Sequence, residues 1–244
     1  MVDVKNWLKI DGHYSQEFGL KMARLPLWPT AAETVENTVI PGVPIEFDRH
    51  TGQYKDFDLT LTGYIKNSFD TRKINSWIQN GKQVILSPQP QMYGMIRKAG
   101  QIFPKRIGTR AAEIQIPLTF QPFKFSCVNI PLNLTTSPAY ICNFGNIFCE
   151  PVYTVTIDSG TILADLTING ITLQIAAAAL DTGTVVIDIP RKKIYKEAAD
   201  GTRTIIQEYT VGQFWRAVLQ PGENVITWDT GISCIKVEMN ERWL

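Results

Sequence analysis

Turn residues punctuate the second half of the chain at short intervals, and this pattern limits what that half can fold into. The turn signals are Asp158-Ser-Gly160, Asn169-Gly170, Asp181-Thr-Gly183, Asp200-Gly201 and Pro221-Gly222. Gly, Asn, Asp and Pro favour tight turns because they accept left-handed or preset backbone angles. Many short strands separated by such turns predict an all-β domain, either a sandwich or a barrel.

The segments between these turns supply the expected strands. We predict eight of them, at residues 153–157, 163–168, 184–189, 192–195, 202–209, 213–219, 224–228 and 234–239. Their order in a sheet does not follow from the pattern.

The first half predicts an α+β domain dominated by antiparallel sheet. Expected strands span residues 4–10, 56–64, 82–87, 92–97, 101–107 and 110–120, and the first ends at the Asp11-Gly12 turn signal. In residues 56–64, apolar and polar side chains alternate, as in a half-buried strand. Pro117 interrupts the last strand and, lacking an N–H group, predicts an edge position or a bulge there.

One helix is expected, at about residues 70–80. Ser68 or Asp70 can cap its start, Gly81 can end it, and Ile74, Trp77 and Ile78 form an apolar stripe that should pack against the sheet.

Residues 19–44 resist assignment. Pro26, Pro29, Pro41 and Pro44 interrupt the segment, and residues 31–37 are weakly helical at best. A long segment without clear structure is usually functional or ordered by a partner. We therefore treat it as a candidate arm.

The texture of the sequence changes across residues 119–151. Phe120, Phe123 and Phe125 end the first pattern, and a polar connector containing proline follows them. We predict a first domain at residues 1–128, a connector at 129–142 and a β-sandwich domain at 143–244.

Composition is that of a globular protein. The chain has 244 residues, of which 44% are hydrophobic and 19% charged, so disorder is not expected as its main state. No apolar run approaches the ~20 residues of a membrane span, and the N-terminus lacks the apolar core of a signal peptide. We expect synthesis in a cytoplasm.

The two halves of the chain differ in charge. Residues 1–125 hold 16 Lys and Arg against 11 Asp and Glu, and residues 126–244 hold 8 Lys and Arg against 12 Asp and Glu. The imbalance is either ordinary variation or a basic surface for an acidic partner.

No catalytic, cofactor-binding or metal-binding residue is predicted. The two histidines, His13 and His50, form no known catalytic motif. The four cysteines contain no Cys-x-x-Cys pair and have no neighbouring histidine, which argues against zinc and favours buried free thiols in a reducing compartment.

Two pairs of carboxylates could suggest a glycosidase but are spaced wrongly for one. Glu46/Asp48 and Asp56/Asp58 are each two residues apart, so each pair shares one face of a strand and cannot flank a sugar bond. Asp56 and Asp58 alternate with an apolar set and are expected on a solvated face.

Tryptophans and a basic run leave two weaker alternatives open. Trp215, Trp228 and Trp243 could stack on carbohydrate, but in a domain of this size they are more often core residues. The run Arg191-Lys-Lys193 followed by Lys196 could bind a polyanion, but a solvated hairpin explains it more simply.

Several of these features, taken in order, resemble the distal tail proteins of long-tailed, non-contractile bacteriophages and their prophages. The resemblance covers essentially the whole chain. It rests on Pro41-Gly42, Tyr54-Lys-Asp-Phe-Asp-Leu-Thr-Leu61, Ile74-Asn-Ser-Trp77, Gly81-Lys82, Phe120-Gln-Pro-Phe123, Asn143-Phe-Gly-Asn146, Glu150-Pro151, Leu166-Thr-Ile-Asn-Gly170, Gly212-Gln-Phe-Trp215, Pro221-Gly-Glu-Asn224 and Glu241-Arg-Trp243. No single motif is specific; their order and spacing carry the resemblance.

The resemblance implies a structural hub at the tail tip of a virion. In that family the first domain forms a hexameric ring, single or double, between the tail tube protein and the tail-associated tip protein. The second domain is a galectin-like sandwich to which receptor-binding or baseplate proteins attach. A six-fold ring requires heterologous interfaces, and the arm in residues 19–44 is expected to reach a neighbouring copy. The resemblance implies no enzyme activity, no cofactor and no sequence-specific nucleic-acid binding, although DNA would pass through the channel.

The chain departs from some relatives in one respect. Residues 145–244 barely exceed one sandwich, so no inserted carbohydrate module fits. A purely structural hub is therefore favoured, with carbohydrate binding by the second domain as the alternative.

Overall fold

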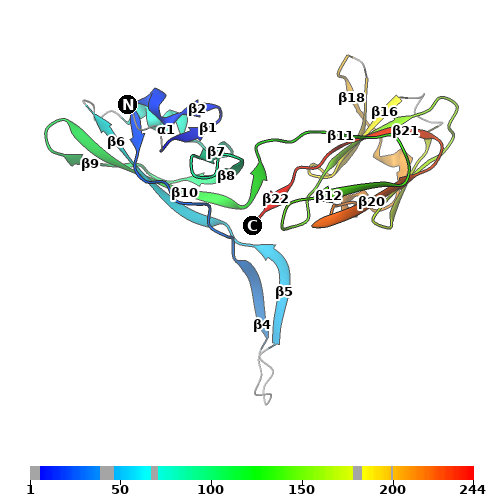
Figure 1. Cartoon of the computed structure of the whole chain (residues 1–244), viewed down its shortest axis with the longest axis horizontal. Coiled ribbons are helices and arrows are strands. Elements are labelled where there is room, and N and C mark those ends of the chain that lie inside the picture. The colour runs from blue at the N-terminus through cyan, green and yellow to red at the C-terminus, as the bar shows by residue number, and fades with distance from the viewer. Residues whose placement is uncertain (1–5, 39–46, 67–70, 178–182, 199) are drawn as a thin grey trace. The chain divides into compact units, whose positions relative to one another are not determined.

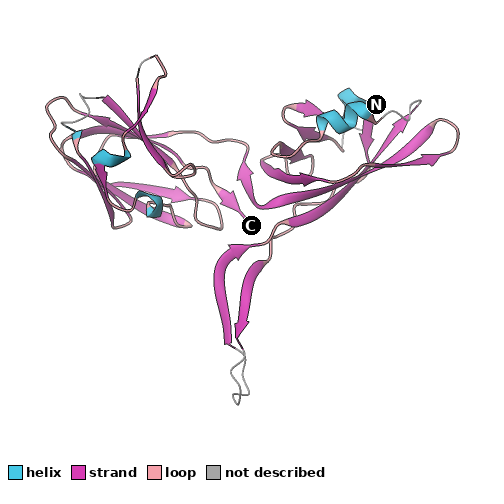
Figure 2. Ribbon diagram, turned by 180° about the vertical axis from the view of Figure 1, so that it is seen from behind, coloured by secondary structure: helices cyan, strands magenta, loops and turns pink. Residues whose placement is uncertain are grey.

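The computed structural model describes residues 6–38, 47–66, 71–177, 183–198 and 200–244. The chain divides into two compact units, residues 1–127 with Leu244 and residues 128–243. Strands dominate both units and their pairs are antiparallel, which confirms a mainly β fold (Figures 1 and 2). None of the helices in the described ranges is long and apolar enough to cross a membrane.

The first unit is built around one antiparallel sheet. Its strand order is β2-β1-β7-β8-β10-β6-β3, and β9 also pairs with β10. The bounds are β1 Leu8–Ile10, β2 His13–Tyr14, β3 Leu20–Met22, β6 Phe57–Lys66, β7 Gln83–Leu86, β8 Met92–Ala99, β9 Phe103–Ile107 and β10 Ala111–Ser126. The strand expected at 4–10 is described only from Leu8 onward, and the other five predicted strands of this half are confirmed with shifted ends.

The long strand β10 shows why this sheet has one buried face. Ile114, Ile116, Leu118 and Phe120 alternate along it and are at most 2% exposed. They join residues of β1, β6, β7 and β8 in one core. The side chains between them are mostly polar and lie on the opposite face, which the core does not cover.

Helix α1 (Arg72–Trp77) packs on the buried face of this sheet. It is shorter than predicted, but the expected stripe of Ile74, Trp77 and Ile78 is buried. The Trp77 indole stacks on Phe18 of the 3-10 turn η1 (Ser15–Phe18) at 4.6 Å, and its Nε1 donates to the Ile10 carbonyl at 3.2 Å. Thr71 precedes the helix without a side-chain cap; the predicted caps Ser68 and Asp70 lie outside the described residues.

Pro117 occupies a central strand rather than an edge. It pairs with Thr60 of β6 on one side of β10. On the other side the partner strand is interrupted: β9 pairs up to Gln115, β8 starts at Leu118, and the Gly100 N–H donates to the Pro117 carbonyl at 2.8 Å. The expected edge is therefore wrong and the expected irregularity is correct. A proline is tolerated here because the ladder has a gap where its donor is missing.

The segment expected to be an arm divides into two parts. The first part does not protrude. Its strand β3 joins the sheet, and Leu25, Trp28 and Ala31 are buried. Residues 31–37, expected to be weakly helical, instead enter strand β4 (Glu33–Thr38). The expectation failed because the pairing partner β5 (Phe47–Tyr54) lies beyond the segment.

Strands β4 and β5 form a separate two-stranded sheet, which we call the arm (Figure 1). Its pairs run from Glu33 opposite Tyr54 to Thr38 opposite Phe47, with an irregularity near Val35. Residues 39–46 between the two strands lie outside the described residues. The predicted arm is thus a hairpin that starts later and ends later than expected.

The second unit consists of two antiparallel sheets. One has the order β11-β21-β13-β16-β17-β18 and the other β12-β20-β14-β15-β19. The bounds are β11 Leu132–Leu134, β12 Ala139–Asn143, β13 Val152–Ile157, β14 Ala164–Ile168, β15 Ile171–Ile175, β16 Gly183–Asp188, β17 Lys193–Glu197, β18 Arg203–Ile205, β19 Thr210–Val211, β20 Gly222–Trp228 and β21 Ile232–Glu238; β22 (Arg242–Trp243) follows.

Both sheets of the second unit contribute to a single core. Tyr153 and Val155 from the first sheet and Leu166 and Ile168 from the second are fully buried in it. The Tyr153 hydroxyl donates to the Ala217 carbonyl at 3.0 Å, so its one buried polar group is satisfied. This arrangement agrees with the predicted all-β domain.

Several parts of the second unit differ from expectation. The strand expected at 202–209 is limited to β18, and β15 was not expected. Residues 129–142, expected to be a connector, contain β11 and most of β12, which pair with β21 and β20. The strand expected at 213–219 is instead a 3-10 turn, η4 (Phe214–Arg216), preceded by η3 (Gln207–Tyr209). For β11 and β12 the pairing partners are distant in sequence, and local patterns do not report them.

Candidate assembly surfaces

The histidines do not form a catalytic group. The His13 Nδ1 lies 2.9 Å from a Glu17 carboxylate oxygen, and the His50 Nδ1 lies 3.2 Å from one of Glu33. Both imidazoles are well exposed. Within the described ranges, no three His, Cys, Asp or Glu side chains gather as a metal site would require.

The cysteines are four free thiols. Cys149 is buried and Cys234 is partly exposed, but Cys127 and Cys142 are exposed, so the expected burial is wrong for these two. Burial raises the pKa of the Cys149 thiol to about 12. This thiol therefore stays protonated near neutral pH and is a core residue rather than a nucleophile.

The carboxylate pair Asp56/Asp58 lies on a solvated surface, as expected. An Asp56 oxygen accepts from Arg97 Nε at 3.1 Å, and Asp58 accepts from the Thr119 hydroxyl at 2.6 Å. Both aspartates therefore have structural partners. The other pair, Glu46/Asp48, falls where side chains are outside the described residues.

The three C-terminal tryptophans have different environments. Trp228 packs against the core of the second unit, as expected, and Trp243 is partly exposed. Trp215, in contrast, is 50% exposed beside Phe214. The preference for a core role is wrong for Trp215.

The basic run at 191–193 forms the turn between β16 and β17. The Arg191 guanidinium binds the buried Asp188 carboxylate at 2.7 Å, and this contact raises the pKa of Arg191. Lys192 and Lys193 are exposed. The run is a solvated hairpin turn, which is the simpler of the two sequence interpretations.

Some of the motifs that carry the family resemblance in the second unit fix turns through side-chain hydrogen bonds. The buried Asn143 amide donates to the Ile147 and Leu219 carbonyls at 3.1 and 3.2 Å and accepts from the Gly145 N–H at 2.9 Å. A Cβ on Gly145 would overlap the Arg242 carbonyl. Asn143 and Gly145 therefore have a structural role, since they fix the packing of two chain segments.

A second hydrogen-bond network surrounds Asn224. Its side-chain oxygen accepts from the Gln220 N–H and from the Asn169 amide, each at 2.7 Å, and its amide nitrogen donates to the Gln220 and Gly222 carbonyls at 2.8 Å. Asn169 and Gly170 themselves form the left-handed turn between β14 and β15, with φ of 47° and 80°.

A buried lysine, not foreseen from the sequence, holds the base of the arm. Lys124 lies on the core-facing side of β10 and is 2% exposed, and its Nζ donates to the Pro29 carbonyl at 2.8 Å. It also lies 5.8 Å from the centre of the Phe57 ring. Burial without a nearby carboxylate lowers the pKa of Lys124 to about 8. Alternation along the sequence does not reveal this position, because the register of β10 against β8 shifts between Phe120 and Lys124.

Other contacts fix the same region. The Tyr54 and Phe123 rings meet edge to face at 5.8 Å, and the Lys55 N–H donates to the Ala32 carbonyl at 2.8 Å. The Trp28 ring packs against Phe120 at 5.0 Å, while its buried Nε1 has no acceptor among the described residues. The base of the arm is thus rigidly attached, whereas β4 and β5 themselves are mostly exposed.

Strand β9 is the other exposed element of the first unit. All five of its residues are exposed, including Phe103 at 54% and Ile107 at 45%. Among the described strands it pairs with β10 alone. Large apolar side chains on an exposed edge strand are typical of a surface that another chain covers.

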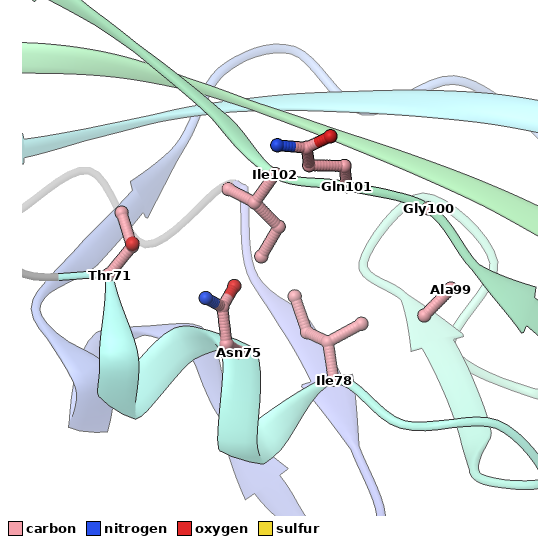
Figure 3. Close-up of a pocket in the computed structure, with 7 residues that line it drawn as sticks. All are labelled: Thr71, Asn75, Ile78, Ala99, Gly100, Gln101 and Ile102. Carbon is pink, nitrogen blue, oxygen red and sulfur yellow. The ribbon is translucent and has the colours of Figure 1, made fainter.

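A cavity of about 470 Å³ lies between α1 and the interruption that separates β8 from β9 (Figure 3). Ile78 and Ile102 extend toward each other across it. It is lined by Thr71, Asn75, Ile78, Ala99, Gly100, Gln101 and Ile102. No acid or base is among these lining residues, so the cavity offers no proton-transfer chemistry.

Several apolar side chains of the second unit are exposed, among them Val128, Ile130, Tyr140, Phe144, Ile162 and Leu163, and four more lie close together in sequence at residues 205–215. Ile205, Tyr209, Val211 and Trp215 are between 38% and 69% exposed. They extend from β18, an edge of one sheet, to β19, an edge of the other. Such a strip suits attachment of a protein or of another planar apolar surface.

Comparison with known proteins places these surfaces on a known fold. No family model and no curated protein matches the sequence. Among solved structures, the chain is similar to the Dit protein of phage SPP1, described as a paradigm of the hub adsorption apparatus in phages that infect Gram-positive bacteria, with a TM-score of 0.72 and 14% identity over 98% of this chain and 99% of that one. A second match, to the baseplate of phage P2 in its activated, calcium-bound conformation, has a TM-score of 0.49 and 7% identity over 95% and 96% of the two chains. The chain therefore has the fold of a phage distal tail protein over its whole length.

Proposed function

We propose that this protein is a structural hub of a phage tail tip. The observation that carries the proposal is the likeness to the SPP1 Dit protein, which includes both units and almost every residue of either chain. At 14% identity this likeness concerns the fold, and the hub role is our inference from it. The hydrogen bonds of Asn143 and Asn224 are in keeping with it, because they give the motifs that contain these two residues a structural role.

In this role the first unit forms a ring, which we expect to be hexameric. The ring joins the tail tube protein on one side to the tail-associated tip protein on the other, and DNA passes through its channel. The exposed arm and the exposed strand β9 support ring formation, because both present surface that the described part of the chain does not cover itself. The first domain, expected at residues 1–128, is then the ring-forming part.

The second unit is expected to be a galectin-like sandwich outside the ring. The exposed strip at Ile205, Tyr209, Val211 and Trp215 supports a role in holding receptor-binding or baseplate proteins. The protein is then a virion component located at the distal tail tip, made in the cytoplasm of the host bacterium, and it needs no cofactor and catalyses no reaction.

The size of the particle tests the ring. Light scattering of the purified protein and negative-stain microscopy should show six-fold rings, or pairs of rings, alone or after addition of the tube and tip proteins. A monomer at every concentration, with both partners present, would contradict the proposal.

Carbohydrate binding by the second unit is the alternative, and the half-exposed Trp215 is the observation in its favour. A sugar stacked on this indole would lose its binding in Trp215→Ala. Binding of the intact protein to a glycan array, lost in that variant but kept in Tyr209→Ala, would support the alternative. A protein without glycan binding that still assembles into rings would exclude it in favour of the hub.

A further inference from the structure

Residues 23–32 link β3 to β4 and lie against the core of the first unit without joining its sheet. They contain no helix or strand, and they pair with none of the described strands. From Met22 to Ala31 the exposure of the side chains repeats every three residues, with one buried, one partly exposed and one exposed position in each repeat. A repeat of three is typical of a polyproline II segment, which has no internal hydrogen bonds. We call residues 23–32 the strap.

Buried side chains hold the strap closed. Leu25, Trp28 and Ala31 are 5%, 8% and 7% exposed, and the Trp28 ring packs edge to face against Phe120 at 5.0 Å. The Trp28 N–H donates to the Gln89 side chain at 2.8 Å. Closure therefore depends on the packing of these side chains and not on a backbone ladder, so the strap can open without breaking any pair of strands.

Two polar groups under the strap are buried at a cost in free energy. The Trp28 Nε1 has no acceptor among the described residues. The Lys124 ammonium donates to the Pro29 carbonyl at 2.8 Å, and burial lowers the pKa of this amine to about 8. A buried donor without an acceptor and a buried charge without a counter-ion both favour a state in which water reaches them.

One movement relieves both costs. Trp28 and Pro29 are consecutive residues of the strap, so lifting this part of it exposes the indole N–H and frees the Lys124 amine together. The pairs of β10 with β6 and β8 are not involved. The opposing term is the apolar contact that Trp28 loses with Phe120.

We propose that the strap opens as a unit around Trp28 and Pro29 while the sheet stays folded, and that Lys124 is the group that favours opening. The closed strap fixes the start of β4, because the Ala32 carbonyl accepts from the Lys55 N–H at 2.8 Å. Opening releases this bond and loosens the base of the arm on the β4 side. The strap thus controls how firmly the arm is held. The device belongs to the single chain and does not rest on the proposed hub.

Two buried indoles of the first unit test the opening directly. Trp28 and Trp77 lie in the same core, and the Trp77 Nε1 donates to the Ile10 carbonyl outside the strap. Hydrogen exchange of the two indole N–H groups is measured by NMR on the full chain, in water and in low concentrations of urea. The Trp28 group should exchange at least about tenfold faster than the Trp77 group, and the Lys55 amide should follow Trp28.

Urea separates local opening from unfolding. Opening of the strap exposes little surface, so urea should hardly change the exchange rate of Trp28, whereas it should raise that of Trp77. Equal rates with the same dependence on urea would overturn the proposal, because strap and sheet would then open together.

A substitution tests the role of the lysine. Lys124→Met keeps an unbranched side chain but removes the charge, so the open state no longer gains its hydration. The Trp28 indole should then exchange about tenfold more slowly. The matched control is Lys98→Met, which removes an exposed lysine of β8 and should leave the rate as in the parent. The same Trp28 rate in Lys124→Met and in the parent would contradict the role of Lys124.

Thiol labelling gives a second measurement that needs neither the indole nor the lysine. In a parent with Cys127→Ser and Cys142→Ser, Ala31→Cys places a thiol in the strap and Ala112→Cys places one in β10. Both alanines are buried, at 7% and 0% exposed. The thiol of Ala31→Cys should react with a soluble alkylating reagent at least about tenfold faster, as mass spectrometry of the peptides can show. Labelling of the two thiols at the same rate would exclude a separate opening of the strap.

Discussion

The two units bury their sheets in different ways. The sheets of the second unit cover each other, whereas the sheet of the first unit has a face that no core of the described residues covers. In the second unit two sheets share one core. The side chains of Asn143 and Asn224 form hydrogen bonds with backbone groups in its turns. In the first unit one sheet has a core on one face only, and its arm and β9 remain exposed. A buried cation without a carboxylate partner adds a further cost there. The described residues of the second unit thus form one core between two sheets, whereas those of the first unit leave one sheet face, the arm and β9 exposed.

The strongest test of this contrast removes the centre of the second core. Tyr153→Ala should cost about 3–5 kcal/mol, because a large side chain leaves a cavity and the Ala217 carbonyl loses its donor. Calorimetry of the whole chain should show the transition of one unit lowered and the other unchanged. Tyr153→Phe, which removes the hydroxyl alone, should cost only about 1 kcal/mol. A shift of both transitions in Tyr153→Ala would show that the units do not melt independently.

The next test concerns the hydrogen bonds of the buried Asn143 side chain. Asn143→Ala should cost about 2–3 kcal/mol, because two buried carbonyls and one N–H lose their partner. Urea unfolding followed by circular dichroism measures the loss. The control is Asn129→Ala, which removes an exposed contact to Asn240 and should change stability by less than about 0.5 kcal/mol. Equal losses of unfolding free energy in the two variants would mean that the Asn143 hydrogen bonds contribute no more than a surface contact.

Lys124 tests the first unit in the opposite direction, because its removal should stabilise the fold. Lys124→Met should raise stability at pH 7 by about 1–2 kcal/mol, the relief of a buried charge less one hydrogen bond to Pro29. An unchanged or lowered urea midpoint would contradict this.

The same lysine predicts a pH dependence. Its pKa is about 8 in the folded protein against 10.5 as the ordinary value. Below pH 8 both states bind the proton and the cost of burial is complete; between pH 8 and 10.5 only the unfolded state keeps the proton, so stability rises with pH. The gap between Lys124→Met and the parent should therefore narrow from pH 8 to pH 10. A constant gap would show that the amine is not the cause.

The smallest effect is expected on the uncovered face of the first sheet. Thr119→Val removes a hydroxyl that donates to the exposed Asp58 at 2.6 Å, and it should change stability by less than about 0.5 kcal/mol. Chemical unfolding at neutral pH checks this value. A loss above 1 kcal/mol would mean that this face is more closely organised than its exposure indicates.

The parts of the fold that follow local patterns could be predicted from the sequence. The alternation in 56–64 gave strand β6, and Asn169-Gly170 gave the turn between β14 and β15. The stripe of Ile74, Trp77 and Ile78 gave the buried side of α1. In each case the signal and the structure it specifies lie within a few residues of each other.

Features that depend on distant partners were missed. Strand β4 carries polar residues that suit several conformations, and its pairing with β5 decides the outcome. Strands β11 and β12 looked like a connector because their partners are distant in sequence: Leu132 pairs with Val237 of β21, and Ala139 pairs with Ile226 of β20. The role of Lys124 follows only when its place on the core-facing side of β10 is known.

The interruption at Gly100 and Pro117 has a dynamic consequence. Strands β8 and β9 both pair with β10, but the ladder between them is broken, and β8 has a further neighbour in β7 while β9 is exposed throughout. Opening of β9 therefore disrupts few contacts and needs no movement of β8, so its amides should exchange with solvent at a much lower free energy. Such an edge can open locally while the rest of the sheet keeps its hydrogen bonds.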